Sequence, residues 1–231
     1  MKYLGGKNLN GFYQKIINLI PKHSVYIETH LGSGAIMRYK RPARINYGIE
    51  INKQVLNNFK GNFNPKNINL ICSDSLEFLK NFNFTGDEFI YCDPPYLKAT
   101  RKSNRNIYKY EYSNKQHIEL LEILTRLPCN IMISGYYSDL YNVYLKNWHA
   151  YNFDVKTRSG AWAKEYLWMN YKRPTKLHDY SYVGNDFRER ERIKRKVSRW
   201  TNRLQSMPEL ERNAILTSVI KKFSLIKYSN F

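Results

Sequence analysis

The tetrapeptide Asp93-Pro94-Pro95-Tyr96 combines the groups needed to hold a flat ring that carries an amino group. It directly follows the apolar run 89–92, which predicts a buried strand, and the carboxyl end of a parallel strand faces the crevice where α/β sheets bind ligands. The Pro94 carbonyl and the Asp93 carboxylate can accept the two N–H donors of an exocyclic amine, while the Tyr96 ring offers a stacking face. The alternative is a proline-rich turn that only ends a strand.

Further ligand-binding candidates follow the preceding strands. Gly32 and Gly34 let the backbone approach a ligand closely, but Met37 stands where a dinucleotide fingerprint has its third glycine, which disfavours a nicotinamide oxidoreductase. Glu50 closes the second strand, where an acidic side chain can accept from two ribose hydroxyls. Asp74 follows the third strand and is either a ligand acceptor or the N-cap of the next helix, two roles that do not exclude each other.

The elements that position these residues alternate as in a parallel sheet with helical crossovers. The predicted helices are Gly34–Arg41, Lys53–Phe59, Leu76–Phe82, Lys115–Leu127 and Asp139–Trp148. The predicted strands are Ser24–Glu28, Ile45–Ile49, Ile68–Cys72, Glu88–Cys92, Cys129–Ser134, Ala150–Val155 and Glu165–Tyr171. The last two strands have no helix between them and should pair as an antiparallel hairpin at the sheet edge. We therefore expect an α/β fold with a seven-stranded mixed sheet.

The remainder of the chain predicts a basic helical hairpin. Residues 172–231 hold 15 Lys and Arg against 6 Asp and Glu. One amphipathic helix carries Ile193, Val197, Trp200 and Leu204 on a single face, and Ser206 with Glu209 suggests a capping box that opens a second helix. We expect a first domain over 1–174 and an extension over 175–231 that packs on it through the apolar face. Contact of the charged face with DNA stays an open alternative.

Charge and composition narrow the class of partner. The 231 residues contain 38 Lys and Arg against 19 Asp and Glu, a net charge of +19, which favours a polyanion and makes nucleic acid the default candidate. Cys72, Cys92 and Cys129 have no CxxC spacing, so we expect buried thiols, no disulfide and no metal. No run approaches the roughly 18 apolar residues of a membrane span, and the first residues lack a signal core, so we expect a cytoplasmic protein without a membrane partner.

Several motifs together resemble the Dam-like (D12 class) DNA adenine-N6 methyltransferases, most closely the compact phage and prophage type. The motifs occur in the family order, and the resemblance covers roughly residues 1–205. They are Lys2–Lys7, Glu28–Ala35, Glu50, Asp74, Asp93–Tyr96, Lys164–Tyr171 and the tail phrase around 178–192. The resemblance implies a Rossmann-like class I methyltransferase fold that uses S-adenosyl-L-methionine and acts on double-stranded DNA. It implies a bacterial or phage-infected host cytoplasm as the location.

The resemblance also assigns site residues. The implied catalytic residues are Asp93, Pro94, Pro95 and Tyr96. The implied cofactor-binding residues are Tyr3, Gly5, Gly6, Lys7, Glu28, Gly32, Ser33, Gly34, Ala35, Glu50, Ile51, Asp74, Ser75 and Asp93. Glu28 would meet the charged methionine portion, or would only cap the following turn. His30 stands where the family usually has an apolar aromatic residue, and neither His30 nor His117 is a good candidate for a general base.

The segment after Tyr96 combines cations with aromatic side chains. Cations follow phosphates and aromatic rings stack on unpaired bases, so we interpret this segment as a DNA-facing loop rather than a solvated connection. Ser134, Gly135 and Tyr136 either lie near the target or form a tight turn. The candidate nucleic-acid-binding residues are Lys7, Lys98, Arg101, Lys102, Arg105, Tyr108, Lys109, Tyr110 and Tyr136.

The predicted reaction is methyl transfer from S-adenosyl-L-methionine to the exocyclic amine of an adenine flipped out of DNA, as in a restriction-modification enzyme. The alternative is an RNA (rRNA) adenine-N6 methyltransferase, and a rival from another class is a degenerate DNA-binding module. A Gln-directed protein methyltransferase would normally have Asn in place of Asp93. Only 19 positions separate Asp74 from Asp93, which leaves no room for a recognition insert and predicts a short or loosely read site. We expect a monomer or a weak dimer.

Overall fold

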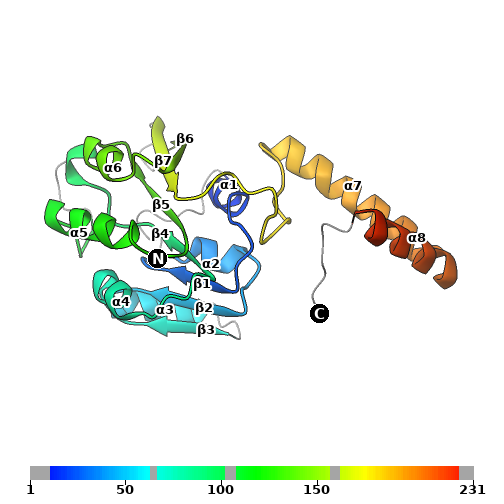
Figure 1. Ribbon diagram of the computed structural model, residues 1–231, viewed down its shortest axis with the longest axis horizontal. Helices are drawn as coiled ribbons and strands as arrows, with labels where there is room; N and C mark the ends of the chain where they lie inside the picture. The colour runs from blue at the N-terminus through cyan, green and yellow to red at the C-terminus, as the bar shows by residue number, and fades with distance from the viewer. Residues whose placement is uncertain (1–10, 63–66, 102–107, 157–161, 224–231) are drawn as a thin grey trace. The chain divides into compact units, whose positions relative to one another are not determined.

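The computed structural model describes residues 11–62, 67–101, 108–156 and 162–223. The chain divides into two compact units, Met1–Tyr182 and Val183–Phe231 (Figure 1). The expected boundary at residue 174 falls inside the first unit, because the segment beyond it is held there. The His178 amide donates to the Ile20 carbonyl at 3.0 Å, and the Asp179 carboxylate accepts from the Arg41 amide at 2.8 Å.

The first unit is built on a seven-stranded mixed sheet of order β3-β2-β1-β4-β5-β7-β6. Strands β3, β2, β1, β4 and β5 are parallel, and β7 runs antiparallel to both β5 and β6. The strands span β1 Val25–Glu28, β2 Ile45–Ile49, β3 Ile68–Ile71, β4 Glu88–Cys92, β5 Asn130–Tyr136, β6 His149–Lys156 and β7 Trp162–Met169. All seven strands and the antiparallel hairpin are therefore confirmed.

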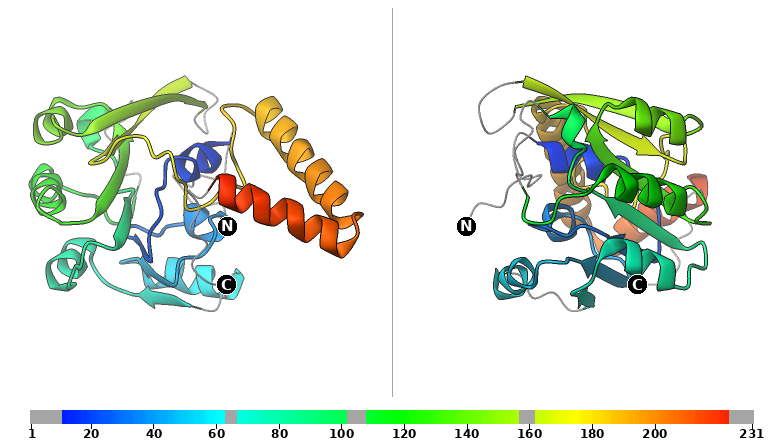
Figure 2. Two further views of the ribbon diagram at one scale, coloured as in Figure 1. Left: turned by 45° about the vertical axis from the view of Figure 1, so that its right-hand side comes forward. Right: turned by 90° about the vertical axis from the view of Figure 1, so that its left-hand side faces the viewer.

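Helices cover both faces of the sheet, which gives three layers (Figure 2). One apolar cluster packs α1, α2 and α3 against one face, and a second packs α4, α5 and α6 against the other. The helices span α1 Phe12–Ile17, α2 Ala35–Tyr39, α3 Lys53–Asn62, α4 Ser75–Asn81, α5 Asn114–Leu124 and α6 Asp139–Tyr144, with a 3-10 turn η1 at Lys98–Thr100. The all-buried pattern of β4 is what a central parallel strand covered on both faces requires.

The second unit contains two helices, α7 Phe187–Gln205 and α8 Glu209–Lys222. The expected capping box at Ser206 is wrong. Ser206 keeps helical backbone angles as the C-cap of α7, and its hydroxyl donates to the Arg203 carbonyl at 2.9 Å, whereas an N-cap residue needs an extended backbone. Pro208 precedes α8 instead. The packing of these helices on the first unit stays a prediction.

Two further sequence expectations concern thiols and membranes. Cys92 and Cys129 are buried as expected, but Cys72 is exposed, because it lies directly after the edge strand β3. None of the helices in the described ranges is long and apolar enough to cross a membrane.

Candidate active site at the carboxyl edge of the sheet

The sheet changes the direction of its crossovers between β1 and β4, and this switch point positions the candidate site. From β1 the chain proceeds outward to β2 and β3, then returns to place β4 on the other side of β1. Loops leaving the carboxyl ends of such neighbours diverge and open a crevice. The loop at 29–34 follows β1, and Asp93–Tyr96 follows β4. The topology thus brings together two motifs that lie about 60 residues apart in the chain.

Asp93 is oriented by a hydroxyl from the neighbouring strand. The Ser134 hydroxyl on β5 donates to the Asp93 carboxylate at 2.7 Å, and the Tyr91 hydroxyl lies 3.2 Å from the same Ser134 oxygen. Ser134 is fully buried, so its rotamer is set by packing. The sequence left the role of Ser134 undecided; the parallel pairing of β4 with β5 is what places it beside Asp93.

Tyr96 is held by side chains from β5 and β7. Its ring meets the Tyr136 ring edge-on, with centroids 4.8 Å apart, and its hydroxyl donates to the buried Glu165 carboxylate. Burial, together with the negative charge of Asp93 and Glu165, raises the pKa of Tyr96 well above its ordinary value, so the phenol stays protonated. Sequence reasoning gave Glu165 no role. The one available signal was a carboxylate in a strand of mainly apolar residues, and it is the strand pairing that places Glu165 opposite Tyr136.

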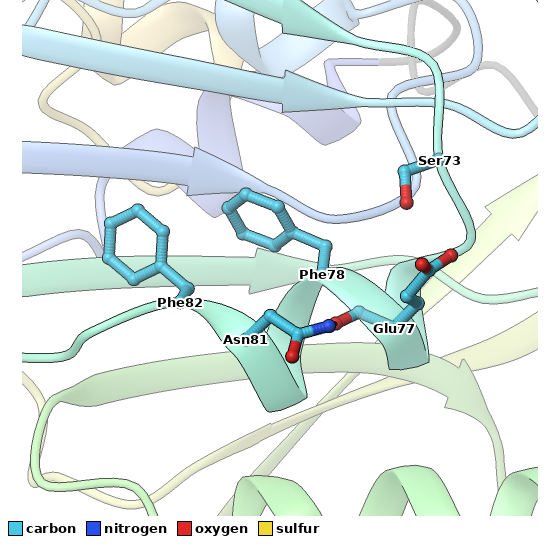
Figure 3. A pocket seen from close by; sticks show the side chains of 5 residues that line it. All are labelled: Ser73, Glu77, Phe78, Asn81 and Phe82. Carbon is cyan, nitrogen blue, oxygen red and sulfur yellow. The ribbon is translucent and has the colours of Figure 1, made fainter.

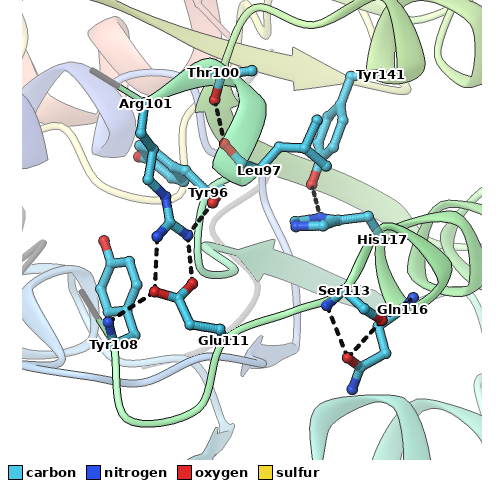
Figure 4. Close-up of polar contacts among 10 residues, drawn as sticks. All are labelled: Tyr96, Leu97, Thr100, Arg101, Tyr108, Glu111, Ser113, Gln116, His117 and Tyr141. Atoms are coloured by element: carbon cyan, nitrogen blue, oxygen red, sulfur yellow. Dashed lines mark hydrogen bonds and ion pairs between the residues drawn. The ribbon is translucent and has the colours of Figure 1, made fainter. Parts of the chain in front are cut away.

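The Arg101 side chain is buried in contacts within its own loop and does not face solvent (Figure 4). Its guanidinium forms a two-pronged ion pair with Glu111 at 2.8 and 2.7 Å and also donates to the Tyr96 carbonyl. The Arg101 side chain is only 5% exposed and that of Glu111 11% exposed. Arg101 therefore ties the two ends of this loop to the Asp93–Tyr96 turn, and its expected phosphate contact does not fit this placement.

Acidic side chains line the neighbouring strand ends. The buried Glu50 carboxylate accepts from the Gly32 amide at 2.9 Å and from the Asn52 amide at 2.9 Å, and burial raises its pKa. Ile51 beside it is 41% exposed. Asp74 caps α4, accepting from the Leu76 amide at 2.7 Å, which confirms the N-cap interpretation. Carboxylates after two neighbouring strands, together with the exposed aliphatic side chain of Ile51, suit a flat base that carries a ribose.

Glu28 is turned inward. Its carboxyl accepts from the Tyr26 hydroxyl and from the Met37 amide in the first turn of α2, each at 3.0 Å. Burial raises the pKa of Glu28 to about 8. The capping role that the sequence offered as an alternative for Glu28 is therefore present.

The turn between β1 and α2 depends on Gly34. Gly34 has φ +61°, and a Cβ placed on it would lie 2.2 Å from the Phe59 ring of α3. The Ser33 carbonyl accepts from the Arg38 guanidinium at 3.1 Å, and Ala35 starts α2 in the core. The Ser75 hydroxyl donates to the Thr29 carbonyl and so joins α4 to the same turn. This packing requires a glycine at Gly34 whether or not a ligand is present.

The two histidines near the site are neutral structural groups. His30 contacts the Tyr112 hydroxyl at 3.1 Å and the Thr29 hydroxyl at 2.9 Å, and burial lowers its pKa to about 3. His117 lies 3.0 Å from the Tyr141 hydroxyl (Figure 4), and burial lowers its pKa to about 4. Neither ring is arranged as a general base, in agreement with the sequence interpretation.

Some of the remaining predicted site residues are at least partly exposed, and the others lie outside the described residues. Lys109 and Tyr110 are exposed, and the Lys109 ammonium lies 5.5 Å from the Tyr110 ring centre. Lys98, Tyr108 and Tyr136 are partly exposed. The predicted residues Tyr3, Gly5, Gly6, Lys7, Lys102 and Arg105 lie outside the described residues.

A surface pocket lies beside α4, and none of its lining residues belongs to the Asp93–Tyr96 turn (Figure 3). It is lined by Ser73, Glu77, Phe78, Asn81 and Phe82, and the two phenylalanine rings lie 5.1 Å apart. The described residues contain no group of three His, Cys, Asp or Glu side chains that could hold a metal ion.

Comparison with known proteins identifies a family whose model matches this chain. A family model described as D12 class N6 adenine-specific DNA methyltransferase matches residues 38–159, more than half of the chain. A comparison with curated proteins finds no match.

Several solved structures are similar to this chain at low identity. SMU.1697c from Streptococcus mutans, in complex with SAH, has 15% identity and a TM-score of 0.46 over 68% of this chain and 94% of that chain. An rRNA methylase from Streptococcus thermophilus has 14% identity and a TM-score of 0.46 over 68% and 92%. The 23S rRNA methyltransferase ErmE has 10% identity and a TM-score of 0.48 over 84% of each chain.

Proposed function

Because the chain belongs to the D12 class N6 adenine-specific DNA methyltransferase family, we propose that it methylates the exocyclic amine of adenine in double-stranded DNA. The chain is a Rossmann-like methyltransferase that depends on S-adenosyl-L-methionine, and the acceptor, the roles of the individual residues and the location are proposed here. When bound, this cofactor supplies a methyl group on a positively charged sulfur. The observation that carries the proposal is the Asp93–Tyr96 turn, held by Ser134 and Glu165 at the switch point of the sheet.

The residues at the strand ends fit the cofactor. Glu50 would accept from the ribose hydroxyls, Ile51 would pack against the adenine ring, and Asp74 would accept from its amine. Glu28 supports this site indirectly, because it caps the helix that follows the Gly32–Gly34 turn. The Gly32 amide already donates to Glu50, so the glycine turn and the ribose site are joined by one hydrogen bond.

The acceptor adenine would lie against the Asp93–Tyr96 turn. The Asp93 carboxylate and the Pro94 carbonyl would accept from the two N–H groups of the amine, drawing its lone pair out of the ring plane and aiming it at the methyl group. Tyr96 would stack on the ring and offset part of the few kcal/mol that flipping the base costs. Among the described residues, Lys98, Lys109 and Tyr110 would contact the DNA strand that carries the flipped base.

The decisive variant is Asp93→Ala. We expect it to lower transfer of a labelled methyl group to duplex DNA by about 10³-fold or more, because the amine loses its charged acceptor, while cofactor binding measured by calorimetry persists. The matched control is Asp87→Ala, the same change at an exposed residue just before the other end of β4. Near-parental transfer by Asp93→Ala contradicts the assignment of the turn.

The choice of nucleic acid is tested in parallel with the parent protein. Labelled cofactor is supplied with duplex DNA or with structured RNA, and we expect the label in DNA. Label in RNA alone would favour the alternative, an RNA adenine-N6 methyltransferase. Sequencing of modified DNA from expressing cells then gives the recognition site, and a location in the cytoplasm where that DNA lies is part of the same proposal.

A further inference from the structure

The helix α7 carries a continuous row of cations. Its 19 residues form a single helix, and the sequence repeats basic residues at spacings of three and four. At about 100° per residue, the row falls within a sector of about 100° and rises about 22 Å along the axis. The row consists of Arg188, Arg192, Arg195, Lys196, Arg199 and Arg203, all of them exposed. We call it the α7 basic row.

The acidic and apolar residues of α7 lie outside the basic row. Glu189 and Glu191, its only acidic residues, border the row, and an exposed ion pair joins Arg192 to Glu189 at 3.5 Å. The apolar residues Ile193, Val197, Trp200 and Leu204 occupy a separate sector of the helix. The basic row and the apolar sector lie side by side on the helix, and the Arg203 guanidinium at the end of the row lies 5.9 Å from the centre of the Trp200 ring.

The second unit as a whole is cationic. Residues 183–231 contain 12 Lys and Arg against 5 Asp and Glu. Neighbouring like charges on a helix repel one another, so a row of this kind costs stability unless a polyanion neutralises it. The row therefore points to a ligand with regularly spaced negative charges.

We propose that the α7 basic row binds the phosphate backbone of duplex DNA, an inference that rests on the proposed function. Duplex DNA carries about one negative charge per 1.7 Å of its axis, so phosphates are dense enough to meet each cation along the row. Five of the six side chains are arginines, whose planar guanidinium can bind a phosphate with two parallel hydrogen bonds. Such contacts position a protein on DNA and carry no sequence information.

The test compares two triple variants of the full chain. In the row variant, Arg192→Gln, Lys196→Gln and Arg199→Gln remove three charges from one side of α7. In the control variant, Lys194→Gln, Lys221→Gln and Lys222→Gln remove three charges from the same unit, outside the row. Fluorescence anisotropy measures binding to a labelled duplex of mixed sequence over a series of salt concentrations, and circular dichroism checks the helix content of both variants.

We expect the row variant to bind DNA about 10- to 100-fold more weakly and to lower the slope of log affinity against log salt by about two to three units. The control variant should stay close to the parent. The KM for duplex DNA should rise in the row variant, while kcat at saturating DNA is kept, because none of the three substituted residues is a candidate catalytic or cofactor-binding residue.

The outcomes separate this inference from the proposed function. Equal binding by the row and control variants overturns the role of α7, even if the parent methylates DNA. Row-dependent binding by a parent that transfers no methyl group to DNA supports the role of α7 and contradicts the proposed function. Row-dependent binding to phosphatidylglycerol vesicles, with DNA binding unchanged in the row variant, also overturns the inference, because a membrane surface would then be the partner.

Discussion

The candidate site depends on residues that do no chemistry themselves. Asp93 and Tyr96 lie on a short turn, but each is oriented by a buried side chain from another strand, Ser134 on β5 and Glu165 on β7. A hydrogen bond to a charged group contributes about 1.5–3 kcal/mol. Loss of such a bond leaves the reacting group present but misdirected, which lowers the rate more than it lowers cofactor binding.

The variant Ser134→Ala tests whether the Ser134 hydroxyl orients Asp93. We expect kcat for methyl transfer to fall about 10- to 100-fold, because Asp93 loses its oriented donor, while the KM for the cofactor stays the same. The control is Ser138→Ala, which removes the N-cap hydrogen bond to the Tyr141 amide of α6 and should lower stability without lowering kcat. An unchanged kcat in Ser134→Ala would mean that Asp93 is positioned by its backbone alone.

At the scale of elements, the turn between β1 and α2 is shaped by packing against α3. Gly34 starts α2 with a left-handed backbone and lies against the Phe59 ring, while the Gly32 amide is fixed by Glu50 after β2. The same turn is joined to α4 through Ser75. The crossovers that contain α2, α3 and α4 therefore all contact this turn, and a change there affects the carboxyl edge of the sheet, where we propose that the cofactor binds.

Gly34→Ala should destabilise the protein by about 2 kcal/mol or more, because the added Cβ combines an unfavourable φ with a collision against Phe59. Urea denaturation followed by tryptophan fluorescence measures the effect. The same substitution at Gly61, which lies in α3 with nothing within 4 Å of an added Cβ, should stabilise by roughly 0.5–1 kcal/mol. Equal effects at the two positions would show that the Phe59 contact is not rigid.

The whole molecule keeps several histidines neutral in its interior. Burial lowers the pKa of His23 to about 2, of His30 to about 3, and of His117 and His178 to about 4. The His23 and His178 rings stack with their centres 3.9 Å apart, beside the buried Lys40. This contact packs the last residues of the first unit against its core. The unfolded chain protonates these rings near pH 6.5, whereas the folded chain does not.

Stability should therefore fall as the pH drops below 6.5, since the unfolded state then binds more protons. Glu28 and Glu50 act in the opposite direction, because burial raises the folded pKa of both carboxyls, that of Glu28 to about 8. Four histidines outweigh these two carboxyls, so we expect a loss of about 2–4 kcal/mol between pH 6.5 and 5.5 in urea denaturation. His30→Phe should reduce this pH dependence by about one proton, whatever its effect on stability at pH 7. A flat profile would contradict the neutral histidine core.

The sequence by itself determined the order of elements, the seven strands, the antiparallel edge hairpin and the Asp93–Tyr96 motif. These follow from local periodicity and from residue types that only a few conformations can use. It also offered the N-cap role of Asp74, because an N-cap is a local interaction, and a capping role for Glu28 toward the turn that follows it.

Only the tertiary structure decided which of these residues meet. Ser134, Glu165 and the Arg101–Glu111 pair acquired their roles from strand order and burial, which join residues separated by 10 to about 70 positions. The sequence predicted a surface role for Arg101 because a basic residue in a polar loop carries no local sign of burial. The direction in which a side chain points depends on the neighbours that the sheet brings to it, and no local pattern contains that information.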